Sequence, residues 1–399
     1  MNVIETMEMK YDLKDTKVVV FGLGYIGIPI LKQLKKHKIN CLGYDISQKR
    51  IDEISLNTTK ITDTEVIKNC CTNCFDKVVD FTTNQECIYI SCVPTLVHED
   101  YSNNYNALEN VIDTIKKIYK KNDIVIIEST VGIGKTFELC NDKFQYYCYS
   151  PERISPNDND DVSKINKLLS TNNDNINVKV FSLYKNIVDN VILINDKNSI
   201  KIAEASKLIE NTQRDINIAL VNEYQLFCKN NGININDVLD VASTKWNFVK
   251  YKPGLVGGQC IGVDPYYIIN SDKNVKLIKL AREINENKIQ ETIVFIENII
   301  KNYNKEDIII LGKTYKPNCA SLENSGAFKI CKYFNLKSYD PLIDIDNVNI
   351  DDYKIHILLV NQENFKDYYN NGNIQNKILI DPFGLNYNIS KSFKMYYTI

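Results

Sequence analysis

The sequence is poor in the features that mark histidine catalysis, nucleic-acid binding and membrane insertion. It has three histidines in 399 residues, and none of His37, His98 and His356 lies beside a recognisable motif, which disfavours histidine-based acid–base chemistry. The formal net charge is −2, without the basic excess that binding to a phosphate backbone requires. No apolar run is long enough to span a bilayer, and residues 1–16 lack the apolar core of a signal peptide. We therefore expect a cytoplasmic protein with no nucleic-acid or membrane partner.

The twelve cysteines also lack the arrangement of a metal site. Cys70, Cys71 and Cys74 form a cluster, but no second pair or histidine follows at the spacing of a zinc site. Without a secretory signal, cysteines are expected to be reduced thiols and not disulfides. We predict no bound metal.

What the sequence does contain is a dinucleotide-binding pattern near its start. Residues 17–22 form a short apolar run that predicts a buried strand, and G-x-G-x-x-G follows at residues 22–27. A helix to about residue 36 and a second strand, 39–44, end at Asp45. In such a unit the pyrophosphate lies on the helix N-terminus and the acid binds the ribose hydroxyls. Because an acid repels a 2′-phosphate, the expected cofactor is NAD.

Apolar runs and helical segments then alternate, as in an α/β doubly wound sheet. Strands are predicted at 87–92 and 124–129, with a helix at 107–121 between them. Ligands of such sheets gather at the carboxyl ends of the strands. Three polar segments stand there: Cys92-Val-Pro-Thr95, Glu128-Ser-Thr130 and Ser150-Pro-Glu-Arg153. Ordinary turns use the same residue types, so this pattern alone leaves both interpretations open.

The second half of the chain predicts a helical region and another α/β domain. Long helices are expected at about 198–230 and 275–303, and strands at 307–312, 355–360 and 377–381. The predicted fold class is thus two Rossmann-like doubly wound domains joined by a central helical domain with a long helix. The predicted boundaries are an N-terminal extension at 1–16, an NAD-binding domain at 17–197, a central helical dimerisation domain carrying a cysteine loop at 198–303, and a nucleotide-binding domain at 304–399.

The loop between the two long helices holds one cysteine among glycines: Gly254-Leu-Val-Gly257-Gly-Gln-Cys260-Ile-Gly-Val-Asp264. Glycine lets the backbone approach another group closely, at a cost in chain entropy. Such a loop suits a reactive cysteine, but it also suits a surface turn with an inert, buried one. The loop by itself does not decide between them.

Taken together, these motifs resemble the UDP-glucose/GDP-mannose dehydrogenase family over residues 17–384. The shared motifs are the glycine loop, Cys92–Thr95, Glu128–Thr130, Ser150–Arg153, Lys207-x3-Asn211, Gly257-Gly-x-Cys260-x3-Asp264 and Gly312-x3-Lys316. Arg214–Asn217, Thr244–Phe248 and Val263–Tyr267 resemble the branch of UDP-N-acetylglucosamine and UDP-N-acetylgalactosamine 6-dehydrogenases.

The resemblance implies an NAD-dependent four-electron oxidation of the sugar C6 hydroxyl to a carboxylate, with UDP-N-acetylglucosamine as the expected substrate. Cys260 would form a thiohemiacetal and then a thioester. Lys207 would favour the thiolate and, with Asn211, would stabilise the oxyanion. The water that cleaves the thioester would be handled by Glu152, Asp264 and Thr130. The family also dimerises through its central helices, which implies a homodimer.

The same resemblance assigns binding residues. NAD is expected at Gly22, Gly24, Tyr25, Ile26, Gly27, Asp45, Arg50, Pro94, Thr95 and Thr130. The UDP-sugar is expected at Glu152, Arg153, Lys207, Asn211, Tyr251, Gly257 and Lys316, with the Rossmann-like domain at 304–399 binding its UDP moiety.

Several residues depart from the family pattern. Gln259 replaces a common histidine, Gly262 and Leu96 replace prolines, and Glu323 stands where an arginine is common. Oxidation of UDP-glucose or UDP-N-acetylmannosamine therefore stays open. So do a single-step hydroxyacid or polyol dehydrogenase, which has no use for Cys260, and a degenerate NAD-binding regulatory protein.

Overall fold

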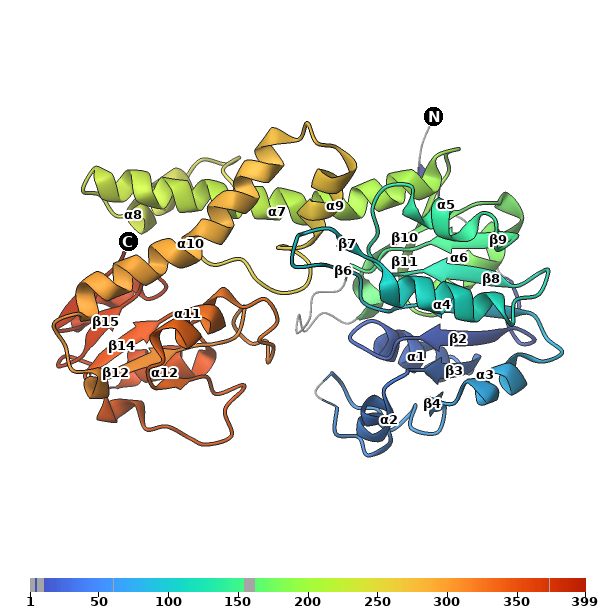
Figure 1. Ribbon diagram of the computed structural model, residues 1–399, viewed down its shortest axis with the longest axis horizontal. Coiled ribbons are helices and arrows are strands. Elements are labelled where there is room, and N and C mark those ends of the chain that lie inside the picture. Colours follow the sequence, from blue (N-terminus) through green and yellow to red (C-terminus); the bar gives the residue numbers. More distant parts are fainter. Residues whose placement is uncertain (1–3, 6–10, 60, 154–161, 373) are drawn as a thin grey trace. The chain divides into compact units, whose positions relative to one another are not determined.

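A nine-stranded, mostly parallel sheet dominates the N-terminal half of the protein (Figure 1). The computed structural model describes residues 4–5, 11–59, 61–153, 162–372 and 374–399. In spatial order the strands are β1 (Ile4–Glu5), β11 (Asn190–Ile194), β10 (Asn166–Thr171), β9 (Tyr146–Tyr149), β8 (Ile124–Ile127), β5 (Cys87–Ser91), β2 (Lys17–Phe21), β3 (Asn40–Tyr44) and β4 (Cys71–Thr72). From β9 to β4 every neighbouring pair is parallel.

Helices cover both faces of this sheet, because successive strand residues point to opposite sides. Val18 and Val20 of β2 belong to one core, and Val19 and Phe21 belong to another. The first core is completed by α1 (Gly27–Lys36), α2 (Gln48–Ser55) and α6 (Asn177–Lys185), and the second by α3 (Phe75–Thr82), α4 (Asn106–Lys116) and α5 (Lys135–Cys140). The predicted doubly wound fold is confirmed.

The chain changes direction at β2, which pairs with β3 on one side and β5 on the other. Such a reversal leaves a crevice at the carboxyl ends of the strands, where ligands of open α/β sheets bind. The glycine loop follows β2 directly, so the fold places it at this crevice. A small antiparallel hairpin, β6 (Leu96–Val97) and β7 (Asn103–Asn104), follows β5.

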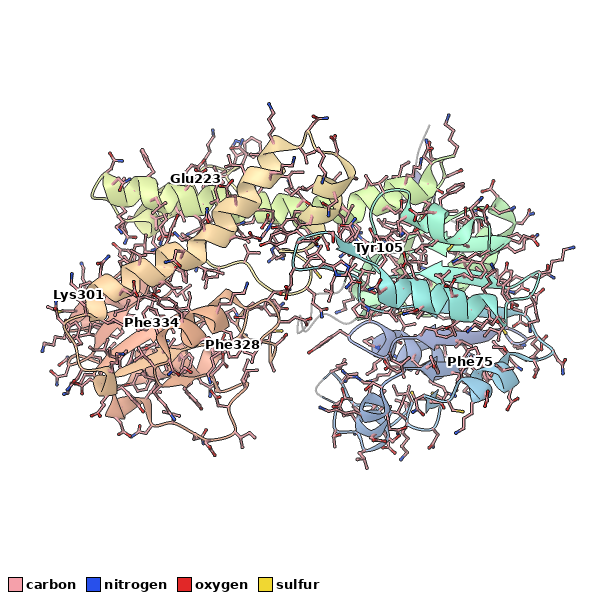
Figure 2. All side chains as sticks on the ribbon, viewed as in Figure 1. Phe75, Tyr105, Glu223, Lys301, Phe328 and Phe334 are labelled. Carbon is pink, nitrogen blue, oxygen red and sulfur yellow. The ribbon has the colours of Figure 1, made fainter. Side chains whose placement is uncertain are left out.

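The second parallel sheet lies in the C-terminal half and has five strands. Their order is β13 (Ser338–Tyr339), β12 (Ile308–Leu311), β14 (Ile355–Leu358), β15 (Ile378–Ile380) and β16 (Met395–Tyr397). One face packs on α11 (Gly326–Phe334) and α10 (Lys276–Ile300), and the other on α12 (Glu363–Asn371). Phe328 and Phe334 are labelled on α11 in Figure 2.

The long helix α7 (Ser199–Asn230) follows the first sheet and is followed by α8 (Ile235–Ala242), while α9 (Asp264–Ser271) precedes α10. Short 3₁₀ helices lie at Val162–Lys164, Asp174–Ile176, Lys305–Asp307, Ile350–Asp352 and Tyr387–Ser392. Among the described helices, none is long and apolar enough to cross a membrane.

The chain forms two compact units, Met1–Ile209 with Tyr266–Ser271, and Glu210–Pro265 with Asp272–Ile399. The predicted domain boundaries stay predictions. Half of the predicted extension, residues 1–3 and 6–10, lies outside the described residues, but β1 pairs with β11 in antiparallel register.

Most predicted elements lie within one or two residues of their observed bounds, but two features differ. The helix predicted to reach residue 121 ends at Lys116, because the carboxylate of Asp123 accepts a hydrogen bond from the backbone of Lys120 (2.9 Å) and holds a turn there. The sheet is also not wholly parallel, since β10 runs antiparallel to β9.

Candidate functional site

The three glycines of the loop between β2 and α1 differ in what surrounds them. Gly22 has φ +89°, and a Cβ there would lie 3.0 Å from the carbonyl carbon of Cys92. A Cβ on Gly27 would lie 1.9 Å from the carbonyl oxygen of Gly22, so a side chain there would open the turn. Gly24 has no atom within 4 Å of the same position. Gly22 and Gly27 are therefore required for packing, whereas Gly24 leaves open space beside the start of the helix.

Asp45 closes this loop from the end of β3. One carboxylate oxygen accepts the backbone N–H of Leu23 (2.8 Å) and the other that of Ser47 (2.9 Å). The acid thus lies beside the glycine turn, as a ribose ligand must. Tyr25 is 39% exposed on the loop, and Ile26 packs against the core. These residues fit the pyrophosphate and ribose of a dinucleotide, with the phosphates at the N-terminus of α1.

Arg50, another predicted cofactor residue, lies on α2 and pairs with Glu53 on the same helix (2.8 Å). A half-buried i,i+3 pair of this kind contributes little to stability. Its role toward the cofactor stays a prediction.

The ends of β5 and β8 are joined by two hydroxyl groups. The Thr95 hydroxyl donates to the carbonyl of Thr130 (2.5 Å), and the Ser129 hydroxyl donates to the carbonyl of Val93 (2.6 Å). The structure therefore brings the predicted residues Pro94, Thr95 and Thr130 to one edge of the sheet.

The loop after Thr130 is held by two side chains. The N–H of Gly132 donates to the Tyr105 hydroxyl (2.9 Å) at the start of α4, where Figure 2 labels Tyr105. Glu204, fully buried on α7, accepts the N–H groups of Gly134 (2.6 Å) and Thr136 (2.9 Å). The sequence analysis assigned no role to Glu204. It caps α5 and fixes the loop that carries Thr130.

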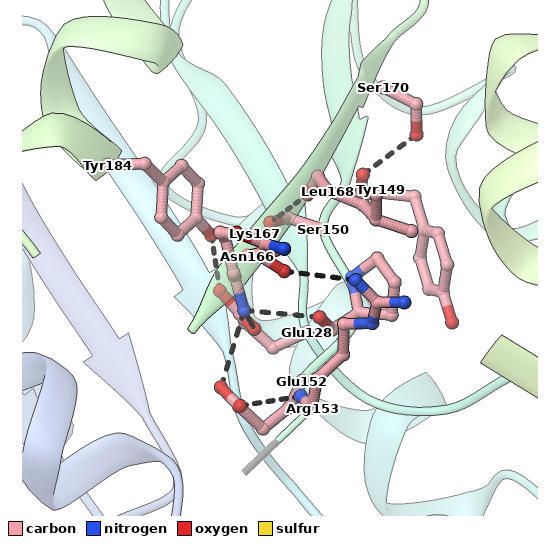
Figure 3. A network of polar contacts seen from close by, with 11 residues as sticks. Glu128, Tyr149, Ser150, Glu152, Arg153, Asn166, Lys167, Leu168, Ser170 and Tyr184 are labelled. Carbon is pink, nitrogen blue, oxygen red and sulfur yellow. Dashed lines mark hydrogen bonds and ion pairs between the residues drawn. The ribbon is translucent and has the colours of Figure 1, made fainter. Parts of the chain in front are cut away.

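The third polar strand end, Ser150–Arg153, surrounds a lysine that the sequence analysis did not find. Lys167 of β10 contacts a carboxylate oxygen of Glu128, the carbonyl of Pro151 (3.3 Å) and a carboxylate oxygen of Glu152 (3.3 Å) (Figure 3). The Tyr184 hydroxyl of α6 donates to the other oxygen of Glu128. A lone lysine in a strand carries no sequence signal, because its partners come from other strands.

Burial dominates the electrostatics of this cluster. Glu128 is fully buried, and its pKa is raised to about 7, mainly by desolvation, although the charge of Lys167 opposes the shift. The pKa of Lys167 is itself raised: desolvation is the largest contribution and acts to lower it, but the charges of Glu128 and Glu152 together outweigh desolvation. The ammonium therefore stays charged at neutral pH, while Glu128 titrates there.

In the second unit, the cysteine loop ends in a turn that starts α9. The carbonyl of Cys260 accepts the N–H groups of Val263 (3.0 Å) and Asp264 (2.8 Å). Asp264 is 2% exposed, and one of its oxygens accepts the side-chain amide of Asn211 (2.5 Å). Nine of the twelve cysteines are buried, whereas Cys260 is exposed, as a nucleophile must be.

The rest of this loop is held by hydrogen bonds to its backbone groups. The amide of Asn222 on α7 binds both the N–H and the carbonyl of Gly254 (3.0 Å each). Gly258 donates its N–H to the carbonyl of Glu323 (3.0 Å), and its own carbonyl accepts the Asn324 amide (3.1 Å). A Cβ on Gly257 would lie 2.8 Å from Tyr315.

A pocket of about 250 Å³ lies beside the second sheet. Its lining includes Ile218, Lys252, Leu255, Lys316, Asn361 and Phe383. Lys316, predicted to bind substrate, is part of this lining. Tyr251 instead packs against a small apolar cluster that contains Val221 and Leu239.

The predicted catalytic residues are divided between the two compact units. Thr130, Glu152 and Lys207 belong to the first unit, and Asn211, Cys260 and Asp264 belong to the second. Lys207 and Asn211 stand one turn apart on α7, as their spacing predicts. Assembly of the two groups into one site stays a prediction.

Two family models match this chain, and both describe domains of the same family. The NAD-binding domain of the UDP-glucose/GDP-mannose dehydrogenase family matches residues 16–188, and the central domain of that family matches residues 201–287. The chain is 36% identical over 361 residues to the UDP-N-acetyl-D-glucosamine 6-dehydrogenase of Pseudomonas aeruginosa, which covers 84% of this chain and 83% of that protein. It is 31% identical to the UDP-N-acetyl-D-mannosamine dehydrogenase of Methanococcus vannielii, with 95% of both chains covered.

Solved structures agree with the sequence comparisons. The UDP-N-acetyl-mannosamine dehydrogenase of Staphylococcus aureus superposes with a TM-score of 0.77 at 28% identity, covering 96% of this chain and 98% of that one. A dehydrogenase from Pyrococcus horikoshii shares the fold with a TM-score of 0.83 at 24% identity, covering 96% and 99% of the two chains.

The three glycines give a first prediction. Gly27→Ala should destabilise the first unit by roughly 1–3 kcal/mol and weaken NAD binding, because its Cβ meets backbone that cannot move away. Gly24→Ala is the matched variant: it should leave the melting temperature within about 2 °C and still weaken NAD binding. Thermal melts and NAD titration by intrinsic fluorescence measure both quantities. Unchanged NAD affinity in Gly24→Ala would contradict the placement of the cofactor.

The buried Glu128 gives a second prediction. Its pKa is raised on folding, so the folded state binds the extra proton, and the stability that this contributes is lost as pH rises from about 4.5 to about 7. Glu128→Gln should therefore gain stability over the wild type as pH increases through this window, by on the order of 1–3 kcal/mol. Urea unfolding at pH 5, 6, 7 and 8 measures the difference.

Glu86→Gln is the control for this measurement: Lys179 lowers the pKa of Glu86, so this carboxylate stays ionised from pH 5 to 8, and the stability difference between Glu86→Gln and the wild type should not change over this range. If the difference between Glu128→Gln and the wild type does not change with pH, Glu128 is not the titrating group.

Proposed function

Because this chain belongs to the UDP-glucose/GDP-mannose dehydrogenase family and is an NAD-dependent nucleotide-sugar dehydrogenase, we propose that it oxidises the C6 hydroxyl of a UDP-N-acetylhexosamine to the carboxylate. The predictions of the family, of NAD and of dehydrogenase activity are confirmed by these matches. The observation that carries the proposal is the exposed Cys260, in a glycine loop whose backbone is held by Asn222 and Asn324.

A double oxidation requires a nucleophile that holds the aldehyde for the second step, and Cys260 can supply it. NAD, held at the glycine loop and Asp45, would supply the hydride acceptor for both oxidation steps at the sugar carbon, one NAD for each step. In the first step C6 loses a hydride and its hydroxyl loses a proton, which gives the aldehyde. After the first, the Cys260 thiolate adds to the C6 aldehyde, and the oxygen takes up a proton to form the thiohemiacetal. Loss of a second hydride and of that proton gives the thioester. Water then adds to C6, the C–S bond breaks, and the carboxylate and the thiol are released.

The polar groups assigned to the proposed site match the charges of these steps. An oxyanion at C6 requires donors that are already in place. The Asn211 amide is oriented by its bond to Asp264, and Lys207 stands one turn earlier on the same helix. In the proposed site these two groups stabilise the oxyanion, while Thr130, Glu152 and Asp264 hold the attacking water.

The substrate class is argued from the second sheet and from the relatives. The pocket beside it has Lys316 and Lys252 for phosphate and apolar walls, such as Phe383, for a base. We propose that UDP binds there. N-acetylated sugars are favoured because the similar proteins include both a UDP-N-acetylglucosamine and a UDP-N-acetylmannosamine dehydrogenase, and we take UDP-N-acetylglucosamine as the first candidate.

A homodimer is proposed from an exposed apolar stripe. Leu220, Tyr224 and Phe227 are all exposed and share one face of α7, at positions i, i+4 and i+7. Leu277 and Leu280 of α10 are also exposed. Exposed apolar residues that share one face of a helix are typical of an interface.

The third prediction tests the chemistry. Wild type should form two NADH per UDP-N-acetylglucosamine. Cys260→Ser should stop after the first, with the second NADH formed at least roughly 10³-fold more slowly because the hydroxyl is a far weaker nucleophile. Cys74→Ser, which alters the other exposed cysteine, should behave as wild type. Absorbance at 340 nm against sugar consumed gives the ratio.

The result separates the alternatives. One NADH per sugar, unaffected by Cys260→Ser, would identify a single oxidation and remove the cysteine from the mechanism. Activity restored only by UDP-glucose or UDP-N-acetylmannosamine would change the sugar and keep the mechanism. No NADH with any of the three would favour a regulatory protein.

The fourth prediction tests the dimer. Wild type should sediment at twice the 46.0 kDa chain mass. Phe227→Asp should raise the dissociation constant by roughly a hundredfold or more, since it buries an unpaired charge. Ile345→Asp, at a 98% exposed position of the second sheet's domain, is the control. A wild-type monomer at micromolar concentration would contradict the proposal.

A further inference from the structure

The side chain of Lys167 occupies a position that the proposed reaction leaves unexplained. It is 3% exposed, and its ammonium lies among Glu128, which follows β8, and Pro151 and Glu152, which follow β9. An ammonium has three N–H donors, and these contacts can use all of them. Figure 3 shows Lys167 between the two carboxylates.

The contacts of Glu152 explain how its carboxylate is directed. One oxygen faces Lys167 at 3.3 Å, and the other accepts the backbone N–H of Arg153 at 2.6 Å. Its own backbone N–H donates to the carbonyl of Glu128 (3.3 Å). Main chain and side chain of Glu152 are thus both tied to the Glu128–Lys167 pair.

We propose that Lys167 is the positioning residue of Glu152: it holds this carboxylate at the strand edge in the orientation from which it takes the proton of the attacking water. In this step the water oxygen bonds to C6 of the thioester, its proton passes to Glu152, and the C–S bond breaks to regenerate the cysteine. The inference rests on the function proposed above, and Lys167 itself touches no substrate.

Glu128 makes this positioning dependent on pH. When Glu128 is protonated, Lys167 and Glu152 form a neutral pair, and when it ionises the two carboxylates compete for one ammonium. The other titratable groups around the cluster are Tyr184 on α6, Cys92 after β5 and Cys148 on β9. Burial raises the pKa of all three, so they stay neutral near pH 7 and leave Glu128 as the group that changes.

The fifth prediction concerns hydrolysis of the thioester. Lys167→Met should slow it by roughly 10- to 100-fold, because a displaced base costs about this much, while the first hydride transfer stays near the wild-type rate. The adduct on Cys260 should then accumulate in a quenched reaction and be seen by intact mass spectrometry. Lys167→Arg, which keeps a positive charge, should recover most of the rate.

The control and the double variant separate positioning from stability. Lys179→Met removes another buried lysine, paired with Glu86, and should affect melting without adduct accumulation. Lys167→Met with Glu152→Gln should hydrolyse no more slowly than Glu152→Gln alone, since residues that act as a unit are not additive. A further multiplicative loss in the double variant would overturn the inference.

If Lys167→Met does not fold, Glu128→Gln decides the question. The ratio of wild-type to Glu128→Gln hydrolysis rates should fall as pH rises through about 7, because only the wild type gains a competing carboxylate. A ratio that is constant from pH 6 to 8 would refute the positioning role. Absence of NADH from the wild type with all three sugars would instead refute the proposed function, and this inference with it.

Discussion

A buried polar group must find a hydrogen-bond partner, and in this protein three such groups hold the loops that carry the candidate site. Glu204 binds the backbone after Thr130, Asn222 binds Gly254 at the start of the cysteine loop, and Lys167 binds the segment that contains Glu152. Each of the three is less than 10% exposed. Loops are otherwise the least fixed parts of a fold, so these anchors set the precision of any chemistry that the loops perform.

Two of the anchors lie on α7, which explains why this helix is so polar. An amphipathic surface helix would place its carboxylates and amides in solvent, as Glu223 is placed. Instead Glu204 and Asn222 point inward, and Asp215 is buried against Arg282 (2.7 Å) and Asn285 (2.8 Å). At these positions the helix makes hydrogen bonds and an ion pair in place of apolar contacts. Leu220, Tyr224 and Phe227 then remain exposed on another part of its surface.

The sequence was sufficient for features that depend on neighbouring residues. The glycine turn with Asp45, the i,i+4 pair Lys207–Asn211 and the long helix follow from local spacing, and the structure shows them as predicted. Lys167 could not be found in this way. Its partners, Glu128 and Glu152, come from other strand ends, and β10 meets β9 in an antiparallel pairing that no local pattern indicates.

Burial also distinguishes among the cysteines in a way that composition cannot. Desolvation raises the pKa of Cys140 and of Cys331 to about 12, so these thiols stay protonated and unreactive at neutral pH. Cys260 is exposed, and the backbone of Gly257 and Gly258 nearby packs against Tyr315 and Asn324, which leaves no room for side chains at these two positions. The unusual Glu323 has little effect on this arrangement. Its contact with Gly258 is made through the backbone carbonyl while its side chain lies in solvent, so the loop keeps its shape whatever charge stands at that position.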